Sequence, residues 1–422
     1  MSIFSLLTPN RRIALATLLG ILAGYLHLPS VYAVADAVSA VFINLLKLVS
    51  LPIIFLSIVS TASGMESVSE IKSLGKRVIK YTMLTTILAA SVALILFVVL
   101  DPVSSQTFAA GVQNGEIAQQ GSYYTYLLKS IPSNIVQPFY ENHVIGVLFI
   151  AMMLSLAILT LPTHNRTVLH SLFSSLYAAV MKITTWVVAL MPLAIWAFIT
   201  LFIKDFRNGI EVKSLALYLA CVILANLVQA LVVLPLLLKY KGISPLRMAR
   251  GMMPALSVAF FTKSSSAALP MAMRCAQQRL GMSPKISSFT LPLCTTINMN
   301  GCAAFILITV LFVSMSNGMV FSGPEMFLWI FISTLAAIGN AGVPMGCYFL
   351  ASAFLAAMNV PLNILGVILP FYTMIDMLES AINVWSDSCV AGIVDHEVAN
   401  DVANGMPVPE PEPLEIKTNR CC

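Results

Sequence analysis

Charged residues are scarce in this chain of 422 residues. Asp, Glu, Lys and Arg together make up 10% of the sequence, whereas soluble domains carry about 25%. This shortage excludes an ordinary water-soluble enzyme, a disordered protein and a nucleic-acid binder. No charged residue or histidine lies between residues 285 and 325, or between 325 and 376. Since roughly 20 apolar residues cross a bilayer, the sequence predicts an all-α polytopic membrane protein.

Motifs of catalysis are also missing. No HExxH, GxSxG or P-loop pattern is present, which argues against metalloprotease, hydrolase and ATP-driven chemistry. An intramembrane enzyme is disfavoured because the serines near residue 265 have no base within the same motif. The eight cysteines lack CxxC and metal-ligand spacing, and the six inside or beside apolar segments are interpreted as small buried hydrophobic residues. The terminal Cys421 and Cys422 could accept a lipid or simply end a mobile tail.

Clusters of charges and turn residues divide the first part of the chain into helices. We predict them near residues 13–33, 37–64, 78–100, 143–162, 168–203 and 214–239. Arg11 and Arg12 precede an apolar run that resembles a signal peptide, but no cleavage site closes it, so we expect a retained first helix. Positive charge gathers after the second and sixth helices, which places both termini in the cytoplasm.

Two later segments are interrupted by polar or turn residues. Segment 254–281 contains Lys-Ser-Ser-Ser at 263–266, and segment 325–360 contains Gly-Asn-Ala-Gly-Val-Pro at 339–344. Irregular backbone at membrane depth survives only where it is buried in protein or lines a polar cavity. A pair of such segments indicates a transporter site built from discontinuous helices. The alternative is that one or both are kinked spanning helices.

The helix that begins near Ile286 carries two side-chain amides, Asn298 and Asn300, with Gly301 directly after them. Asparagine carbonyls and freed backbone carbonyls suit a weakly dehydrated cation. Interhelical hydrogen bonding is the other common role of asparagine in membranes. This stretch alone does not decide between them.

The last apolar helix carries three carboxylates. Asp376, Glu379, Asn383 and Asp387 recur at intervals of three and four residues, which places them along one helical stripe. No lysine or arginine lies between residues 285 and 417, and Lys263 cannot pair with all three. Buried carboxylates are expensive, so a bound cation, an ammonium group or protonation must compensate them.

Three motifs, in this order and spacing, carry a resemblance to a known family. Ser-Ser-Ser-Ala-Ala-Leu-Pro at 264–270, Thr-Ile-Asn-Met-Asn-Gly at 296–301 and Ala-Gly-Val-Pro at 341–344 are similar to those of the dicarboxylate/amino acid:cation symporters. The likeness runs from Leu46 to about Asp395. It implies eight transmembrane helices and two re-entrant hairpins, at 250–282 and 325–360. It also implies a homotrimer in which a transport domain slides like an elevator along a scaffold.

The resemblance divides the chain as follows. Residues 1–77 are scaffold helices one and two, 78–101 transport-domain helix three, and 102–207 scaffold helices four and five. Residues 208–395 hold the rest of the transport domain, and 396–422 form a cytoplasmic, disordered tail. A bacterial inner membrane is the expected location, with membrane lipids, an amino-acid substrate and sodium as partners and without nucleic acid or an organic cofactor.

The resemblance also implies roles for individual residues. The serines of the first hairpin would hold the substrate carboxylate, Asp376 the ammonium group, and the second hairpin would close as a gate. The implied substrate-binding residues are Ser264, Ser265, Ser266, Cys302, Val343, Pro344, Asp376, Glu379, Ser380 and Asn383. One sodium site would use Asn298, Asp387 and the backbone of Cys294 and Asn383. A second would use the backbone of Thr296, Ala337, Ile338 and Asn340, and a weaker third Thr82, Thr85, Thr86 and Asn300.

Three departures from the family pattern bear on the substrate and the ions. Glu379 stands where members that move acidic substrates have an arginine, which favours a small neutral amino acid such as serine or threonine. Asn300 replaces an aspartate of the third sodium site, which weakens it. Cys302 replaces a threonine in the pocket. Proton- or sodium-coupled transport of an acidic substrate, transport of a cationic amino acid, and a channel or receptor remain as alternatives.

Overall fold

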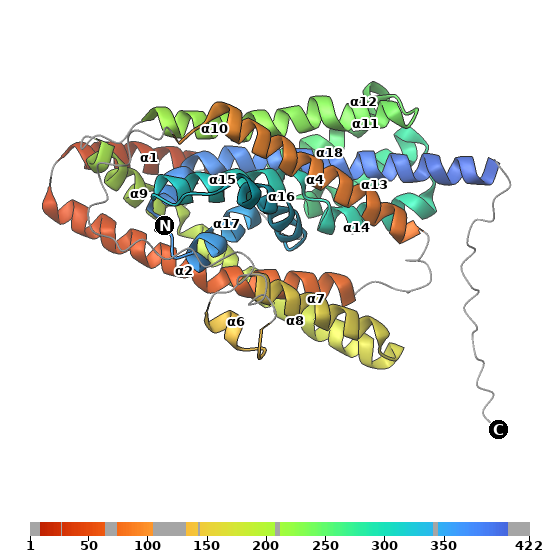
Figure 1. The fold of residues 1–422 in the computed structure, drawn as a ribbon, viewed down its shortest axis with the longest axis horizontal. Helices are drawn as coiled ribbons and strands as arrows, with labels where there is room; N and C mark the ends of the chain where they lie inside the picture. Colours follow the sequence, from red (N-terminus) through yellow and green to blue (C-terminus); the bar gives the residue numbers. More distant parts are fainter. Residues whose placement is uncertain are drawn as a thin grey trace.

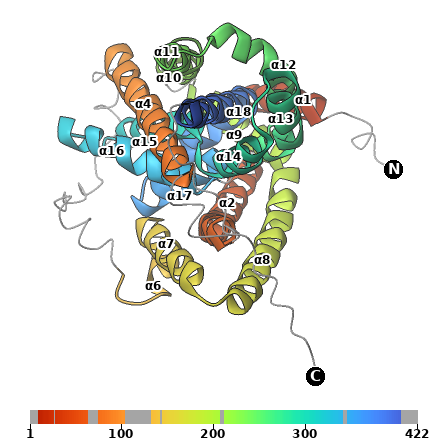
Figure 2. The same cartoon turned by 90° about the vertical axis from the view of Figure 1, so that its right-hand side faces the viewer.

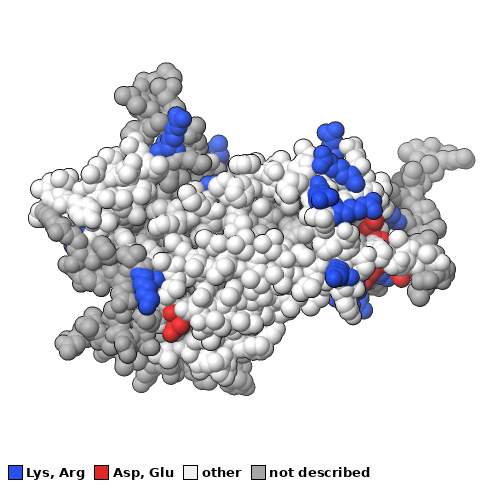
Figure 3. All heavy atoms as spheres, turned by 90° about the horizontal axis from the view of Figure 1, so that it is seen from above, with Lys and Arg blue, Asp and Glu red and all other residues white. Residues whose placement is uncertain are grey.

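The computed structural model describes residues 9–26, 28–63, 74–103, 132–141, 144–206, 212–340 and 345–403. Within these ranges every regular element is helical, which confirms the predicted all-α class. Six of the described helices are long and apolar enough to cross a membrane. Charged side chains gather toward the two ends of the long axis and leave a broad uncharged band between them (Figure 3). Both features are those of a multi-pass membrane protein.

One group of helices comes from the first half of the chain. α2 (Pro29–Ser63) packs against α7 (Val144–Thr160), α8 (Thr163–Ala189) and α9 (Met191–Phe206), while α1 (Pro9–Tyr25) lies along α9. A short helix, α6 (Gln137–Tyr140), packs on α7. Figure 2 shows α2, α7 and α8 together on one side of the molecule.

The second group surrounds α18 (Asn363–Ala403), which runs along the long axis of the molecule (Figure 1). Its members pack on α18 or on α15, which is buried along nearly its whole length. They are α4 (Lys76–Leu100), α10 (Val212–Val228), η3 (Gln229–Val233), α11 (Leu234–Tyr240), α12 (Pro245–Thr262), α13 (Ser265–Leu280), α14 (Pro284–Ile297), α15 (Asn300–Ser316), α16 (Gly323–Ile338) and α17 (Gly346–Ala357).

Both interrupted segments fold as two helical arms. α12 and α13 pack against each other, and the chain reverses at Lys263, whose backbone is left-handed with φ 56°. The backbone N–H of Ala267 donates to Ser264 Oγ over 3.2 Å, so this serine caps α13. α16 and α17 both pack against α15. Lys263 and Ser264 lie between α12 and α13, and Gly339 and Asn340 follow the end of α16, whereas α17 begins at Gly346. Neither segment is a single kinked helix.

Several predicted helix boundaries were wrong. The first break lies at residues 26–28 and not near residue 35, because Pro29 starts α2 and proline favours a first helical turn. The predicted helix 168–203 is divided at Leu190 into α8 and α9. The predicted tail from residue 396 is helical as far as Ala403. Cys421 and Cys422 lie outside the described residues.

Candidate functional site

The predicted helix from residue 286 is broken at the two amides. α14 ends at Ile297, Asn298 and Met299 adopt φ near −103° and −102°, and α15 begins at Asn300. Asparagine side chains compete with the helical backbone bonds, and the break turns the Asn298 side chain toward α18. A single helix was therefore the wrong expectation, although the residues themselves were predicted to matter.

Asn298 joins three elements at this break. Its Nδ2 donates to Asp387 Oδ1 at 3.0 Å and to Ser386 Oγ at 2.9 Å on α18. Its Oδ1 accepts from Thr85 Oγ1 of α4 at 3.0 Å. All four side chains are buried. The structure thus brings Asn298 and Asp387 of the predicted first sodium site into contact, with hard oxygen atoms around them.

Asn300 continues the same network. Its Nδ2 donates to Asn298 Oδ1 at 2.9 Å and to Ser386 Oγ at 2.7 Å, and its Oδ1 accepts from Gln229 Nε2 at 2.8 Å. Gln229 also donates to the backbone oxygen of Thr85 at 3.1 Å. Two oxygens of the predicted third sodium site therefore already accept hydrogen bonds from an amide nitrogen.

The other groups of these sites lie close by. Thr86 Oγ1 donates to the backbone oxygen of Thr82 at 2.8 Å, and Thr82 Oγ1 lies 4.0 Å from Cys294 Sγ. The backbone oxygen of Cys294 accepts from the Asn298 N–H at 2.8 Å. α4, α14 and α18 pack on one another, which positions these groups beside Asp387.

Asp376 lies farther along α18, beside the second hairpin. The Met345 N–H donates to its Oδ2 at 3.3 Å, and Tyr372 O–H reaches its Oδ1 at 3.5 Å. Among the described residues, no Lys, Arg or His nitrogen forms an ion pair with the carboxylate of Asp376, Glu379 or Asp387. Lys263 interacts with Asp376 only as a more distant charge. The predicted lack of compensating cations is therefore confirmed for this part of the chain.

Glu379 shares the Tyr372 hydroxyl with Asp376, and one of its carboxylate oxygens has no hydrogen-bond partner among the described residues. Its Oε2 accepts from Tyr372 O–H at 3.4 Å, whereas its Oε1 has no hydrogen-bond partner. Gly301 makes this packing possible, since a Cβ there would lie 3.0 Å from Glu379 Cα and 3.0 Å from Asn226 Oδ1. The Gly301 N–H donates to Asn383 Oδ1 at 2.9 Å, which fixes α15 against α18.

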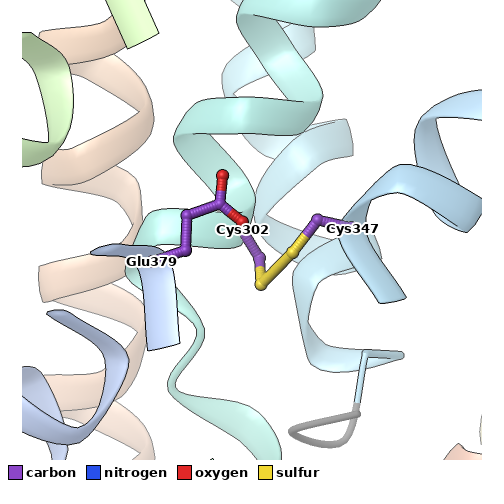
Figure 4. A group of neighbouring side chains, drawn as sticks. All are labelled: Cys302, Cys347 and Glu379. Atoms are coloured by element: carbon purple, nitrogen blue, oxygen red, sulfur yellow. A yellow bond between two sulfur atoms is a disulfide. The ribbon is translucent and has the colours of Figure 1, made fainter. Parts of the chain in front are cut away.

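Cys302 and Cys347 form a disulfide between α15 and α17 (Figure 4). Asn340 Nδ2 donates to Cys302 Sγ at 2.8 Å and to Cys347 Sγ at 3.5 Å. Both cysteines are buried, as interpreted from the sequence, but the disulfide was not foreseen, because a pairing across 45 residues leaves no trace in local spacing. Cys221, Cys275, Cys294 and Cys389 are buried and free, as that interpretation predicted.

The predicted site residues at the two interruptions differ in exposure. At the start of α13, Ser265 is buried, Ser264 is half-buried and Ser266 is exposed. At the end of α16, Ala337 and Asn340 are buried and Ile338 is half-buried, while Val343 and Pro344 lie outside the described residues. Ser380 is buried on α18, and half-buried Thr296 donates to the backbone oxygen of Leu293 at 2.7 Å.

Four residues of this region were not predicted from the sequence. Gln229 and Ser386 complete the amide network, Tyr372 contacts two carboxylates, and Cys347 pairs with Cys302. A glutamine inside an apolar span is a signal that could have been used. Tyr372 lies one helical turn before Asp376, so the stripe could have been extended backward. Cys347 offered no such signal.

Three features indicate a membrane transporter built from discontinuous helices. They are the interrupted pairs α12–α13 and α16–α17, the break between α14 and α15, and buried carboxylates without ion-pair partners among the described residues. The family model described as "Sodium:dicarboxylate symporter family" matches residues 10–397, and the chain belongs to this family. It is therefore a transporter and not an enzyme, as the resemblance implied.

The chain is similar in sequence to several named transporters, including the following three. The chain is 26% identical over 416 residues to "Neutral amino acid transporter B(0)" of Oryctolagus cuniculus, covering 89% of this chain and 75% of that protein. It is 25% identical to "Neutral amino acid transporter A" of Homo sapiens, covering 84% and 74%. A "Putative sodium-dependent excitatory amino acid transporter glt-4" of Caenorhabditis elegans is 30% identical, covering 65% and 55%.

Proposed function

We propose that this protein is a sodium-coupled symporter of a small neutral amino acid, with serine or threonine as the expected substrate. The observation that carries the proposal is the placement of two buried carboxylates, Asp376 and Asp387, on one helix without ion-pair partners among the described residues. A buried carboxylate is compensated by a positive charge or by protonation, and a substrate ammonium group at Asp376 and a sodium ion at Asp387 would supply the two positive charges.

The substrate site would lie between the hairpin tips. Asp376 would bind the ammonium group beside Ser380, and the serines at 264–266 would hold the carboxylate with Asn383, under a gate formed by Val343 and Pro344. A neutral side chain is favoured because Glu379 faces this pocket in place of an arginine. A substrate carboxylate beside it would be repelled.

Sodium would bind at two sites. Asn298, Asp387 and the backbone oxygens of Cys294 and Asn383 would form the first, and the backbone oxygens of Thr296, Ala337, Ile338 and Asn340 the second. The hydrogen bonds from Gln229 to Asn300 and to the backbone of Thr85 support a third site that is weak or lost, because sodium would have to displace them. The expected number of coupled ions is correspondingly low.

The proposed function includes a proposed arrangement of the helices in the membrane. Eight transmembrane helices and two re-entrant hairpins would form a scaffold from helices one, two, four and five and a transport domain from the rest. The two packed groups of helices support this division. The transport domain would move as an elevator within a homotrimer in a bacterial inner membrane, with both termini in the cytoplasm.

One specific observation favours a second substrate class. Glu379 keeps an unpartnered carboxylate oxygen in the pocket, and an ionised Glu379 could pair with the side chain of a cationic amino acid. A protonated Glu379 would instead allow an acidic substrate with proton coupling. These two alternatives predict a different transported amino acid from the one predicted for the neutral symporter.

The test is uptake of labelled serine by purified protein in liposomes under an inward sodium gradient, competed by each standard amino acid. Sodium-driven uptake that serine, threonine or alanine blocks and aspartate does not block is the expected result. Uptake indifferent to sodium would contradict the proposal. If serine is not transported, labelled aspartate and lysine, with a pH jump in the absence of sodium, separate the two alternatives.

A further inference from the structure

Three potential metal ligands converge from three different helices beside the Asp376 pocket. The Sγ atoms of Cys302 and Cys347 and a carboxylate oxygen of Glu379 all lie within 4.8 Å of one another. They come from α15, α17 and α18, and Figure 4 shows the Glu379 carboxylate next to Cys302 and its disulfide partner. The three residues are 1%, 2% and 1% exposed, so this cluster is enclosed by protein.

Two buried oxygen atoms at this cluster have no hydrogen-bond partner among the described residues. Glu379 Oε1 and Asn340 Oδ1 are both buried without a hydrogen-bond partner. Asn340 already faces the two sulfur atoms through its Nδ2, so a half-turn of its amide would present Oδ1 to the same point. The two side chains can therefore add oxygen ligands to the two sulfur ligands.

The combination of sulfur and oxygen selects the kind of cation. A buried carboxylate without a cation favours positive charge. Two thiolates favour soft or borderline metals over sodium, and zinc accepts thiolate and carboxylate ligands together. The proposed sodium site at Asn298 and Asp387 has oxygen ligands and lies at another position along α18, so it is distinct from this sulfur-containing site.

We propose that Cys302, Cys347 and Glu379, once the disulfide is reduced, form a binding site for a thiophilic divalent cation such as Zn²⁺ or Cd²⁺. Reduction by a phosphine breaks the S–S bond, gives two thiols and converts the phosphine to its oxide with an oxygen atom from water. Binding of the cation to the two sulfurs then releases the thiol protons to solvent. Oxidation to the disulfide withdraws both sulfur ligands, so the site exists only in the reduced protein.

The position of the site has a consequence for transport. Glu379 and Cys302 also line the pocket proposed for the substrate, so a bound cation would tie α17 to α15 and α18 and exclude the amino acid. The exclusion of the amino acid by a bound cation rests on the proposed function. The metal site itself does not, because it depends only on the three side chains.

The binding experiment uses the full-length protein in detergent, with Cys421→Ser and Cys422→Ser as background so that the tail cannot chelate metal. The protein is reduced with a phosphine, which is then removed without air, and Cd²⁺ is titrated while the ultraviolet thiolate-to-cadmium charge-transfer absorbance is recorded. The expected result is one Cd²⁺ per chain in reduced protein and none in protein left oxidised. Serine should weaken Cd²⁺ binding by competition.

Variants decide which residues bind the metal. Cys302→Ser and Cys347→Ser should each abolish the absorbance change, and Glu379→Gln should raise the Kd for Cd²⁺ at least tenfold with the absorbance band retained. Cys221→Ser and Cys389→Ser, at buried free cysteines elsewhere, should bind as the background does. If a serine variant fails to fold, Cys302→Ala and Cys347→Ala take its place, with monodispersity as the criterion.

The outcomes separate the two proposals. Absence of Cd²⁺ binding to reduced protein, or binding that survives loss of Cys302 or Cys347, overturns the metal site. Cd²⁺ that binds as expected but does not block uptake of the transported amino acid leaves the metal site standing and contradicts the placement of the substrate pocket at Glu379.

Discussion

Asn298 Nδ2 lies 3.0 Å from Asp387 Oδ1 and donates to it, which ties the break between α14 and α15 to α18. A break in a membrane helix leaves backbone groups that lipid cannot satisfy. Near this break the Gly301 N–H donates to Asn383 Oδ1 at 2.9 Å, and the proposed first sodium site uses the side chains of Asn298 and Asp387. The sodium dependence of transport should therefore be most sensitive at these two residues.

Asp387→Asn removes one negative charge from this cluster while keeping its size. We expect the sodium concentration for half-maximal uptake to rise at least tenfold, which corresponds to about 1.4 kcal/mol. This half-maximal sodium concentration is measured from uptake at a series of sodium concentrations. Asp395→Asn is the control, because Asp395 lies on the same helix but accepts from the Ser283 N–H. Equal effects of the two changes would show that loss of charge on α18, and not the sodium cluster, is responsible.

Asp376→Asn should abolish uptake of every amino acid, because the ammonium group would lose its only carboxylate partner. The fold should persist, since the amide still fits beside Tyr372 and the Met345 N–H. Uptake and gel-filtration behaviour are measured on the same preparation. Near-normal transport by this variant would remove the ammonium role from Asp376.

Glu379→Arg should shift preference toward acidic substrates, because a guanidinium in place of the carboxylate would attract a second substrate carboxylate. We expect the ratio of aspartate to serine uptake to rise at least tenfold. Glu379→Gln is the matched control, since it removes the charge without adding one of the opposite sign. Selectivity that stays the same in both variants would mean that Glu379 does not face the substrate.

Gly301→Ala tests the close contact between α15 and α18. The added Cβ would meet Glu379 Cα and Asn226 Oδ1 at 3.0 Å, and such overpacking costs about 1–3 kcal/mol. We expect a lower melting temperature and reduced uptake. Gly323→Ala is the control because a Cβ there meets nothing within 4 Å. A Gly301→Ala protein as stable as Gly323→Ala would show that the helices separate easily.

A charged group at one end of the molecule links α4, α11 and α18. The Glu397 carboxylate forms two ion pairs. Its Oε1 lies 2.7 Å from Lys241 Nζ, and its Oε2 lies 3.5 Å from Arg77 Nη1. For half-exposed pairs of this kind the expected coupling is about 0.2–1 kcal/mol, measured by a double-mutant cycle of Lys241→Met and Glu397→Gln. The coupling should fall in high salt, and a value that does not change with salt would indicate packing and not charge.

The same pair predicts a pH dependence. The hydrogen bond to Glu397 raises the pKa of Lys241 above its ordinary 10.5. A raised lysine pKa contributes stability that is complete below the ordinary value and is lost as the pH rises through the higher one. The difference in melting temperature between the native protein and Lys241→Met should therefore be constant at neutral pH and shrink in strong alkali.

The carboxylate stripe was predictable because it depends only on helical periodicity and on the absence of basic residues. Asp376, Glu379, Asn383 and Asp387 lie on one continuous helix, as the intervals of three and four residues predicted. The interruptions after α12 and α16 were predictable for a similar reason, since serine, glycine and proline residues mark them locally.

Contacts between distant parts of the chain could not be predicted in this way. Gln229 reaches Asn300 across 71 residues, and the Cys302–Cys347 disulfide spans 45. Both partners in each pair look ordinary in their own segments. The break at Asn298 was also missed, because the hydrogen-bond partners of the Asn298 side chain come from α4 and α18.

The unbroken course of α18 has a thermodynamic consequence. Asp376 and Asp387 are eleven residues apart, or about 16 Å along a helix that rises about 1.5 Å per residue. If the amino acid binds at Asp376 and sodium at Asp387, as proposed, the factor by which sodium changes the affinity for the amino acid must equal the factor by which the amino acid changes the affinity for sodium. A single helix can thus serve as the linkage between an ion gradient and its cargo.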